Sequence, residues 1–358
     1  MKAAKSQLPL YLVLGYTLLV LYASLTPFTG WRDPGHDVLD FLSQPLPRYL
    51  QAFDVVVNVL AYIPIGLLAA LAFPSRSHHP VVVALFGTAV GASLSLSMEV
   101  TQAYLPGRIS SALDLITNVA GAVLGAAIAA QARAAPAIAE RIGSWRARLF
   151  LPGGRTDLGI ALVALWFFSQ LDPSLPLLGV VFFSNGIQAQ LAGLGAESSY
   201  RMLGPISVCL TLMSLGMLLM LLMRSHRSAL AALAVMVWVA ALMKLGAASM
   251  LLRSEAAFLW VSNEIVWAIM LGAALVAFAA LLPRRRLMAL CAISLIGTVL
   301  LTFVRPDEVQ SFLSLRFFRF SDLQLIRYTG LSATVAAVWP YVVLGYMIVL
   351  RIGDRKHV

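Results

Sequence analysis

The stretch FDVVVNVLAYIPIGLLAALAF, residues 53–73, decides the fold class of this chain. It is apolar enough for the hydrocarbon core of a bilayer, and its length suits one helical crossing. Asp54, Asn58 and Tyr62 recur every four residues, so they share one face of that helix. Because polar side chains are costly in hydrocarbon, this face must point into a bundle interior or a wet cavity.

The composition of the whole chain supports the same fold class. Hydrophobic residues make up 60% of the 358 residues, charged residues make up 12%, and the mean hydropathy is +0.86. These values lie outside the range of soluble globular domains. We expect an all-α polytopic integral membrane protein with about ten transmembrane helices. The expected crossings are 8–27, 55–73, 81–103, 113–131, 157–171, 205–223, 229–252, 256–282, 287–304 and 333–350.

The net charge of +10 does not indicate a nucleic-acid partner, because the basic residues are spread between the apolar runs. If the N-terminus is inside, the segments that are then cytoplasmic carry a clear excess of Lys and Arg. This bias predicts that both termini are cytoplasmic. It also places Asp54 at the outer end of its helix.

A second polar stretch follows after residue 98. Glu99 and Gln102 are three residues apart, Arg108 lies in a Pro-Gly link, and Asp114 and Asn118 are four apart. Each Asp taken singly is an ordinary helix cap. A shared outward-facing polar pocket explains better why amide and hydroxyl side chains accompany them. The ligand-binding candidates are Asp54, Asn58, Tyr62, Glu99, Gln102, Arg108, Asp114 and Asn118. Within this set, Arg108 suits an anionic group.

Small residues in the same region predict close helix packing. Gly121 and Gly125 form a GxxxG pattern, and Gly87 and Gly91 lie in the preceding apolar run. The pattern of Asp54 and Asn58 also returns sixty residues later in the chain, which is consistent with a structural repeat or with coincidence.

In the second half, Lys244 and Glu264 fall inside expected crossings that are consecutive. If residues 256–282 form one helix, the two side chains reach a similar depth. An intramembrane ion pair is then possible, either to couple transport or as scaffolding.

No His or Cys spacing fits a metal site, and no nucleotide-binding or nucleophile motif is present. We therefore expect no metal and no cofactor, and we assign no catalytic residue. Residues 132–156 are basic and Ala-rich, which is typical of a cytoplasmic, surface-lying helical linker. The predicted domains are a four-helix membrane domain at 1–131, this linker, and a second membrane region of about six helices at 157–358.

Over residues 8–131 the chain resembles the VanZ-like family of bacterial membrane proteins. The resemblance rests on Asp54-x3-Asn58-x3-Tyr62-x-Pro64-x-Gly66, Glu99-x2-Gln102, Arg108 and Asp114-x3-Asn118-x2-Gly121-x3-Gly125. It implies a compact helical domain, multi-pass in the bacterial cytoplasmic (inner) membrane. The family's namesake is associated with teicoplanin resistance, so the resemblance implies a role in the cell envelope and leaves a link to glycopeptide antibiotic resistance open. The six crossings after residue 157 go beyond the family pattern.

The resulting first hypothesis is a non-catalytic cell-envelope protein. Its pocket would bind an anionic or lipid-linked envelope component, such as a lipid-linked glycan or a peptidoglycan precursor. Its expected partners are thus membrane lipids. Two alternatives stay open. One is a transferase or hydrolase acting on an envelope lipid, with Glu99 or Asp114 as general base. The other is a transporter or flippase that uses Lys244 and Glu264.

Overall fold

The computed structural model describes residues 6–26, 28–45, 52–74, 79–171, 177–179, 196–254, 258, 260–303 and 323–355. The chain forms two compact units, Met1–Ala147 and Arg148–Val358. In the described residues the regular structure is helical, apart from an isolated bridge between Phe150 and Met223. The prediction of an all-α fold is confirmed, whereas the predicted domain limits at 131 and 157 stay predictions.

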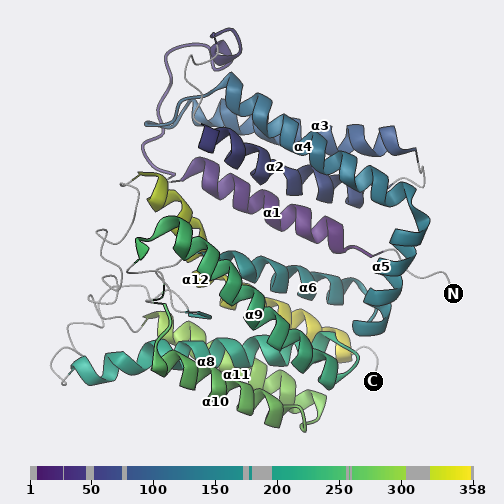
Figure 1. Ribbon diagram of the computed structural model, residues 1–358, viewed down its shortest axis with the longest axis vertical. Helices are drawn as coiled ribbons and strands as arrows, with labels where there is room; N and C mark the ends of the chain where they lie inside the picture. Colours follow the sequence, from purple (N-terminus) through teal and green to yellow (C-terminus); the bar gives the residue numbers. More distant parts are fainter. Residues whose placement is uncertain are drawn as a thin grey trace. The chain divides into compact units, whose positions relative to one another are not determined.

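The first unit is built from apolar helices in up-and-down order. They are α1 (Leu8–Leu25), α2 (Ala52–Ala72), α3 (Pro80–Gln102) and α4 (Ala112–Ala134), followed by α5 (Pro136–Leu149). Figure 1 shows α1 to α4 side by side. The end of α1, the start of α2, the end of α3 and the start of α4 therefore lie at one end of the unit. We call this the polar end.

Glycines bring α2 and α4 into backbone contact. A Cβ added to Gly66 would overlap the carbonyl oxygen of Ala122, and one added to Gly125 would overlap that of Ile63. Gly121 is equally close to the α2 backbone. The two helices are parallel, because both begin at the polar end. Small residues allow this approach, as they do in other membrane helix pairs.

The third helix packs on this pair in the same way. A Cβ on Gly87 would lie 2.5 Å from the carbonyl oxygen of Gly66 and 2.9 Å from the Cβ of Ala126. A Cβ on Gly91 would overlap the side chain of Ala122. The predicted role of these glycines in close helix packing is confirmed.

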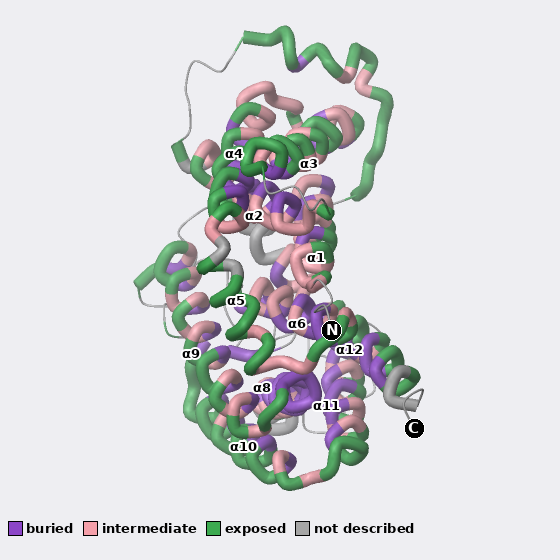
Figure 2. The backbone as a smooth tube through the Cα atoms, turned by 90° about the vertical axis from the view of Figure 1, so that its right-hand side faces the viewer, coloured by how far each residue is buried: buried purple, intermediate pink, exposed green. Residues whose placement is uncertain are grey.

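In the second unit, other helices pack around one buried helix, α8 (Ala196–Leu222). The elements of this unit are α6 (Gly154–Trp166), η2 (Phe167–Leu171), α8, α9 (His226–Leu251), α10 (Asn263–Ala279), α11 (Arg284–Phe303) and α12 (Leu323–Arg355). The α8 helix packs against α9, α10 and α11, and its side chains from Leu215 to Leu222 are almost fully covered. Figure 2 shows this helix as the most buried one of the unit. A helix that is apolar on all sides is stable when its neighbours enclose it in this way.

Eight described helices are long and apolar enough to cross a membrane. They span Leu8–Leu25, Asp54–Ala72, Pro80–Gln102, Ala112–Ala134, Leu203–Leu222, His226–Leu251, Arg284–Thr302 and Leu331–Ile352. The α10 helix is apolar but has 17 residues, and at the expected fifth crossing α6 has 13 residues before the 3-10 turn η2. The multi-span class is thus supported, and the count of ten and the side of the termini stay predictions.

Candidate functional site

Two aspartates open the parallel helices α2 and α4 at the polar end. Asp54 and Asp114 each lie in the first turn of their helix. Asn58 Nδ2 donates a hydrogen bond of 3.0 Å to Asp114 Oδ1. The Asp54 carboxylate is close enough to Asp114 for the two charges to interact. No residue in the described part of the chain donates a hydrogen bond to Asp54. The like charges are therefore only partly compensated.

Glu99 joins the end of α3 to the start of α4. Its side chain is 3% exposed, and its Oε2 accepts a hydrogen bond of 2.8 Å from the backbone N–H of Ser111. Ser110 Oγ donates to the backbone carbonyl of Glu99 at 2.7 Å. Because Ser111 is the N-cap of α4, the carboxylate lies where the partial positive charge of the helix N-terminus favours an anion. Glu99 also interacts electrostatically with Asp114.

Arg108 and Gln102 are bonded to the end of α1. Arg108 Nη2 donates to the carbonyl oxygens of Ala23 at 2.9 Å and Thr26 at 3.2 Å. Gln102 Nε2 donates to the carbonyl oxygen of Ser24 at 2.9 Å. The last carbonyls of a helix have no partner within the helix, so both side chains cap α1 and hold it against the α3–α4 link. The role of Arg108 as an anion ligand stays a prediction.

Arg133 does the same at the opposite end of this unit. Its Nη1 donates to the carbonyl oxygens of Ala70 at 2.9 Å and Phe73 at 3.2 Å, at the end of α2. Its guanidinium also lies 5.8 Å from the centre of the Phe73 ring. A cation is favourable at a helix C-terminus. The recurrence of this contact away from the candidate site favours a positioning role for Arg108.

A second polar layer lies deeper between α2, α3 and α4. Tyr62, Ser95 and Asn118 are all buried. Asn118 Nδ2 donates to Ser95 Oγ at 3.0 Å, and the Tyr62 hydroxyl is close enough to interact with the Ser95 side chain. On α1, the Tyr16 hydroxyl donates to the Ala61 carbonyl oxygen at 3.0 Å. This layer fixes the rotation of the helices about their axes.

The predicted site residues thus divide into groups. Asp54, Asn58, Glu99 and Asp114 come together at the polar end, with Tyr62 and Asn118 one layer deeper and Gln102 and Arg108 against α1. Sequence reasoning missed Ser95 and Ser111. Ser95 precedes Glu99 by four residues on the same helix face. Ser111 precedes Asp114 by three, which is a helix-capping pattern.

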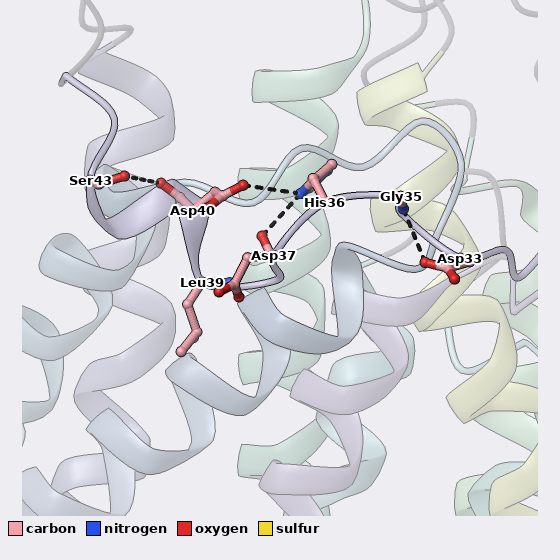
Figure 3. A network of polar contacts seen from close by, with 7 residues as sticks. All are labelled: Asp33, Gly35, His36, Asp37, Leu39, Asp40 and Ser43. Carbon is pink, nitrogen blue, oxygen red and sulfur yellow. Dashed lines mark hydrogen bonds and ion pairs between the residues drawn. The ribbon is translucent and has the colours of Figure 1, made fainter.

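The α1–α2 loop, residues 28–45, begins at the same end. Figure 3 shows its polar contacts, including Gly35 N–H to Asp33 Oδ1 at 3.0 Å and His36 Nδ1 to Asp40 Oδ2 at 3.8 Å. These contacts shape the loop itself, and the contact between His36 and Asp40 is too exposed to add much stability. The backbone N–H of Arg32 donates to the Tyr104 carbonyl oxygen at 3.0 Å, which fastens the loop to the α3–α4 link.

In the second unit, Lys244 and Glu264 lie in different surroundings. Lys244 is fully buried in α9, whereas Glu264 is exposed in the first turn of α10. The expected helix start near residue 256 is wrong, because α10 begins at Asn263 with Ser262 as its N-cap. Glu264 therefore lies one residue inside its helix rather than two turns inside. The ion pair itself stays a prediction.

Eight described helices of crossing length, with polar contacts between α2, α3 and α4 in the first unit, support a polytopic α-helical membrane protein. Residues 8–133 of the chain match the family model VanZ/LLP1. This match confirms the VanZ-like resemblance, and it covers α1 to α4 with their polar residues. No curated protein and no solved structure matches the chain.

Proposed function

We propose that this VanZ-like membrane protein binds the polar head group of a lipid-linked envelope component at its polar end. The observation that carries the proposal is the convergence of Asp54, Asn58, Glu99 and Asp114. These residues come from three helices and are up to sixty residues apart in the chain. A glycan or peptidoglycan-precursor head group carries many hydroxyl and amide donors, which carboxylate and amide oxygens accept.

The charge arrangement supports binding over a purely structural role. The carboxylate of Asp114 is bonded to Asn58, and that of Glu99 to the start of α4, so both stabilise the bundle. Asp54 adds a like charge beside Asp114. Like charges held together cost stability, and such costs are typical of functional sites. In this proposal Arg108 positions α1, and the carboxylates and amides receive the head group.

The proposal includes a location and an orientation. The protein is multi-pass in the bacterial cytoplasmic membrane, with about ten crossings and both termini in the cytoplasm. The polar end then faces the outer leaflet, where lipid-linked wall precursors are exposed. The excess of Lys and Arg in the opposite segments supports this orientation. A role in glycopeptide resistance would follow only if the ligand proves to be such a precursor.

The test is to purify the full chain with its native lipids and identify the lipids by mass spectrometry. Wild type, Asp54→Asn and Glu140→Gln are prepared in parallel, and Glu140 is an exposed carboxylate on α5, away from the polar end. We expect a minor polyprenyl-linked lipid with wild type and Glu140→Gln, and its loss with Asp54→Asn. The same lipids in all three samples would refute the proposal.

A second candidate function is acid–base catalysis on the same lipid. It is favoured by the proximity of two carboxylates in unlike surroundings, with Glu99 bonded to a backbone N–H and Asp114 to an amide side chain. Such pairs suit a general acid and a general base. Glu99→Gln and Asp114→Asn would then retain the lipid and lose turnover of it. Unchanged turnover in both variants would exclude catalysis by these residues.

A further inference from the structure

The α5 helix carries an exposed apolar stripe. Ile138, Ile142 and Trp145 are 50%, 61% and 64% exposed. At 3.6 residues per turn these three side chains fall within a sector of roughly 60°. Figure 2 shows that most of α5 is exposed. A continuous apolar stripe on a short exposed helix indicates a surface that binds a membrane or another protein.

Arginines border this stripe on both sides. Arg141 and Arg148 are exposed and lie along one edge, whereas Arg146 on the other edge is half-buried and its Nε is covered by protein. Glu140 and Ser144 lie on the opposite face of the helix. Arginine stems extend along apolar surface while the guanidinium groups reach phosphate. The helix thus has a polar face and an apolar face, and Arg141 and Arg148 lie between the two.

The position of α5 in the chain matches this pattern. It begins directly after α4, which is long and apolar enough to cross a membrane. Ala135 breaks the helix with a non-helical backbone conformation (ψ 89°), and Pro136 opens the next one. Because α5 starts where a crossing ends, its first residues lie at the height of the lipid head groups. Trp145 is a residue type that prefers this height.

We infer that α5 lies in the plane of the membrane and binds a bilayer surface rich in anionic phospholipid. Ile138, Ile142 and Trp145 enter the head-group boundary, and Arg141 and Arg148 contact lipid phosphates. The stripe is uncharged and suits lipid chains, while the arginines beside it suit lipid phosphates. This combination favours an anionic lipid surface over a second protein as the binding partner. This inference does not depend on the ligand proposed for the polar end.

The test uses the full chain with Cys209 and Cys291 replaced by Ala, and a nitroxide on Ile142→Cys or on Ser144→Cys. The protein is reconstituted in phosphatidylcholine vesicles with and without phosphatidylglycerol. Oxygen and a water-soluble nickel chelate then report whether each label is in lipid or in water. With phosphatidylglycerol we expect the label at 142 in lipid and the label at 144 in water.

Charge variants separate anionic binding from apolar burial alone. R141Q/R148Q should weaken the lipid partition of the label at 142 by about fivefold for each arginine removed. R227Q/R285Q removes two exposed arginines elsewhere in the chain and should leave this partition unchanged. Equal insertion with and without phosphatidylglycerol would overturn the lipid preference. A label at 142 that is in water, or that is shielded from both reagents by protein, would overturn the in-plane helix.

Discussion

Asn58 Nδ2 donates a hydrogen bond of 3.0 Å to Asp114 Oδ1, which joins the second turn of α2 to the first turn of the parallel helix α4, and glycines bring the same two helices into backbone contact. The two residues belong to the two copies of the Asp-x3-Asn pattern. A hydrogen bond to a charged acceptor away from bulk water contributes more than one between neutral groups. This contact is therefore a main link at the polar end.

Removal of this bond should destabilise the first unit. Asn58→Leu leaves Asp114 charged and without its amide donor, so we expect the free energy of unfolding to fall by about 1–3 kcal/mol. Denaturant unfolding of the purified protein measures this change. In the double variant Asn58→Leu/Asp114→Leu much of the loss should be recovered, because no unpaired charge remains. Strictly additive losses would show that the two side chains do not interact.

Asp54 should behave in the opposite way. Asp54→Asn removes a like charge beside Asp114 without removing a hydrogen bond between described residues, so thermal stability should be unchanged or higher. If Asp54 contributes to binding, the same variant loses the co-purifying lipid. A marked fall in melting temperature would instead identify Asp54 as a structural helix cap.

The two capping arginines should differ in function but not in structural effect. Arg108→Gln and Arg133→Gln each remove a guanidinium from the carbonyls at a helix end, with an expected cost of about 1–2 kcal/mol of unfolding free energy. Only Arg108→Gln should reduce the co-purifying lipid, because Arg133 is at the other end of the unit. Equal lipid recovery from both variants would show that Arg108 does not shape the site.

Alanine at Gly121 or Gly125 should separate α2 from α4. The added Cβ would overlap a backbone carbonyl oxygen, which cannot move aside as a side chain can. We expect a loss of about 1–3 kcal/mol, as for overpacked cores. Gly246 in α9 is the matched control, since a Cβ there meets nothing within 4 Å. Gly246→Ala should be neutral or stabilising by about 0.5–1 kcal/mol, because alanine favours helix. Similar losses at all three positions would argue against the close contact.

Cysteine labelling tests the orientation. Ser43 is exposed in the α1–α2 loop, and Ser144 is exposed on α5. An odd number of crossings separates the two positions if α2, α3 and α4 all span the membrane. An impermeant thiol reagent added to intact cells should label Ser43→Cys and not Ser144→Cys. The reverse result would invert the topology and place the polar end in the cytoplasm.

Much of the fold follows from local pattern. Hydropathy placed the crossings of the first unit within a few residues, and the glycine spacing predicted its close packing. The hydropathy pattern predicts that α10 starts near residue 256, because residues 256–262 are mostly apolar. In the structure Ser262 caps the helix, and α10 begins at Asn263. Capping depends on a single side chain. A hydropathy average over many residues does not detect that side chain, so it misses the start of the helix.

The sequence by itself determined the class of the protein and the faces on which polar residues lie. Both depend on helix periodicity and on the cost of polar groups in lipid, which are properties of each segment alone. Only the tertiary structure decided the partners: Asn58 with Asp114, Glu99 with Ser111, and Arg108 with the end of α1. These pairings depend on how far neighbouring helices slide and rotate against each other. Between α2, α3 and α4 that adjustment depends on glycine contacts, and each contact involves two helices at once.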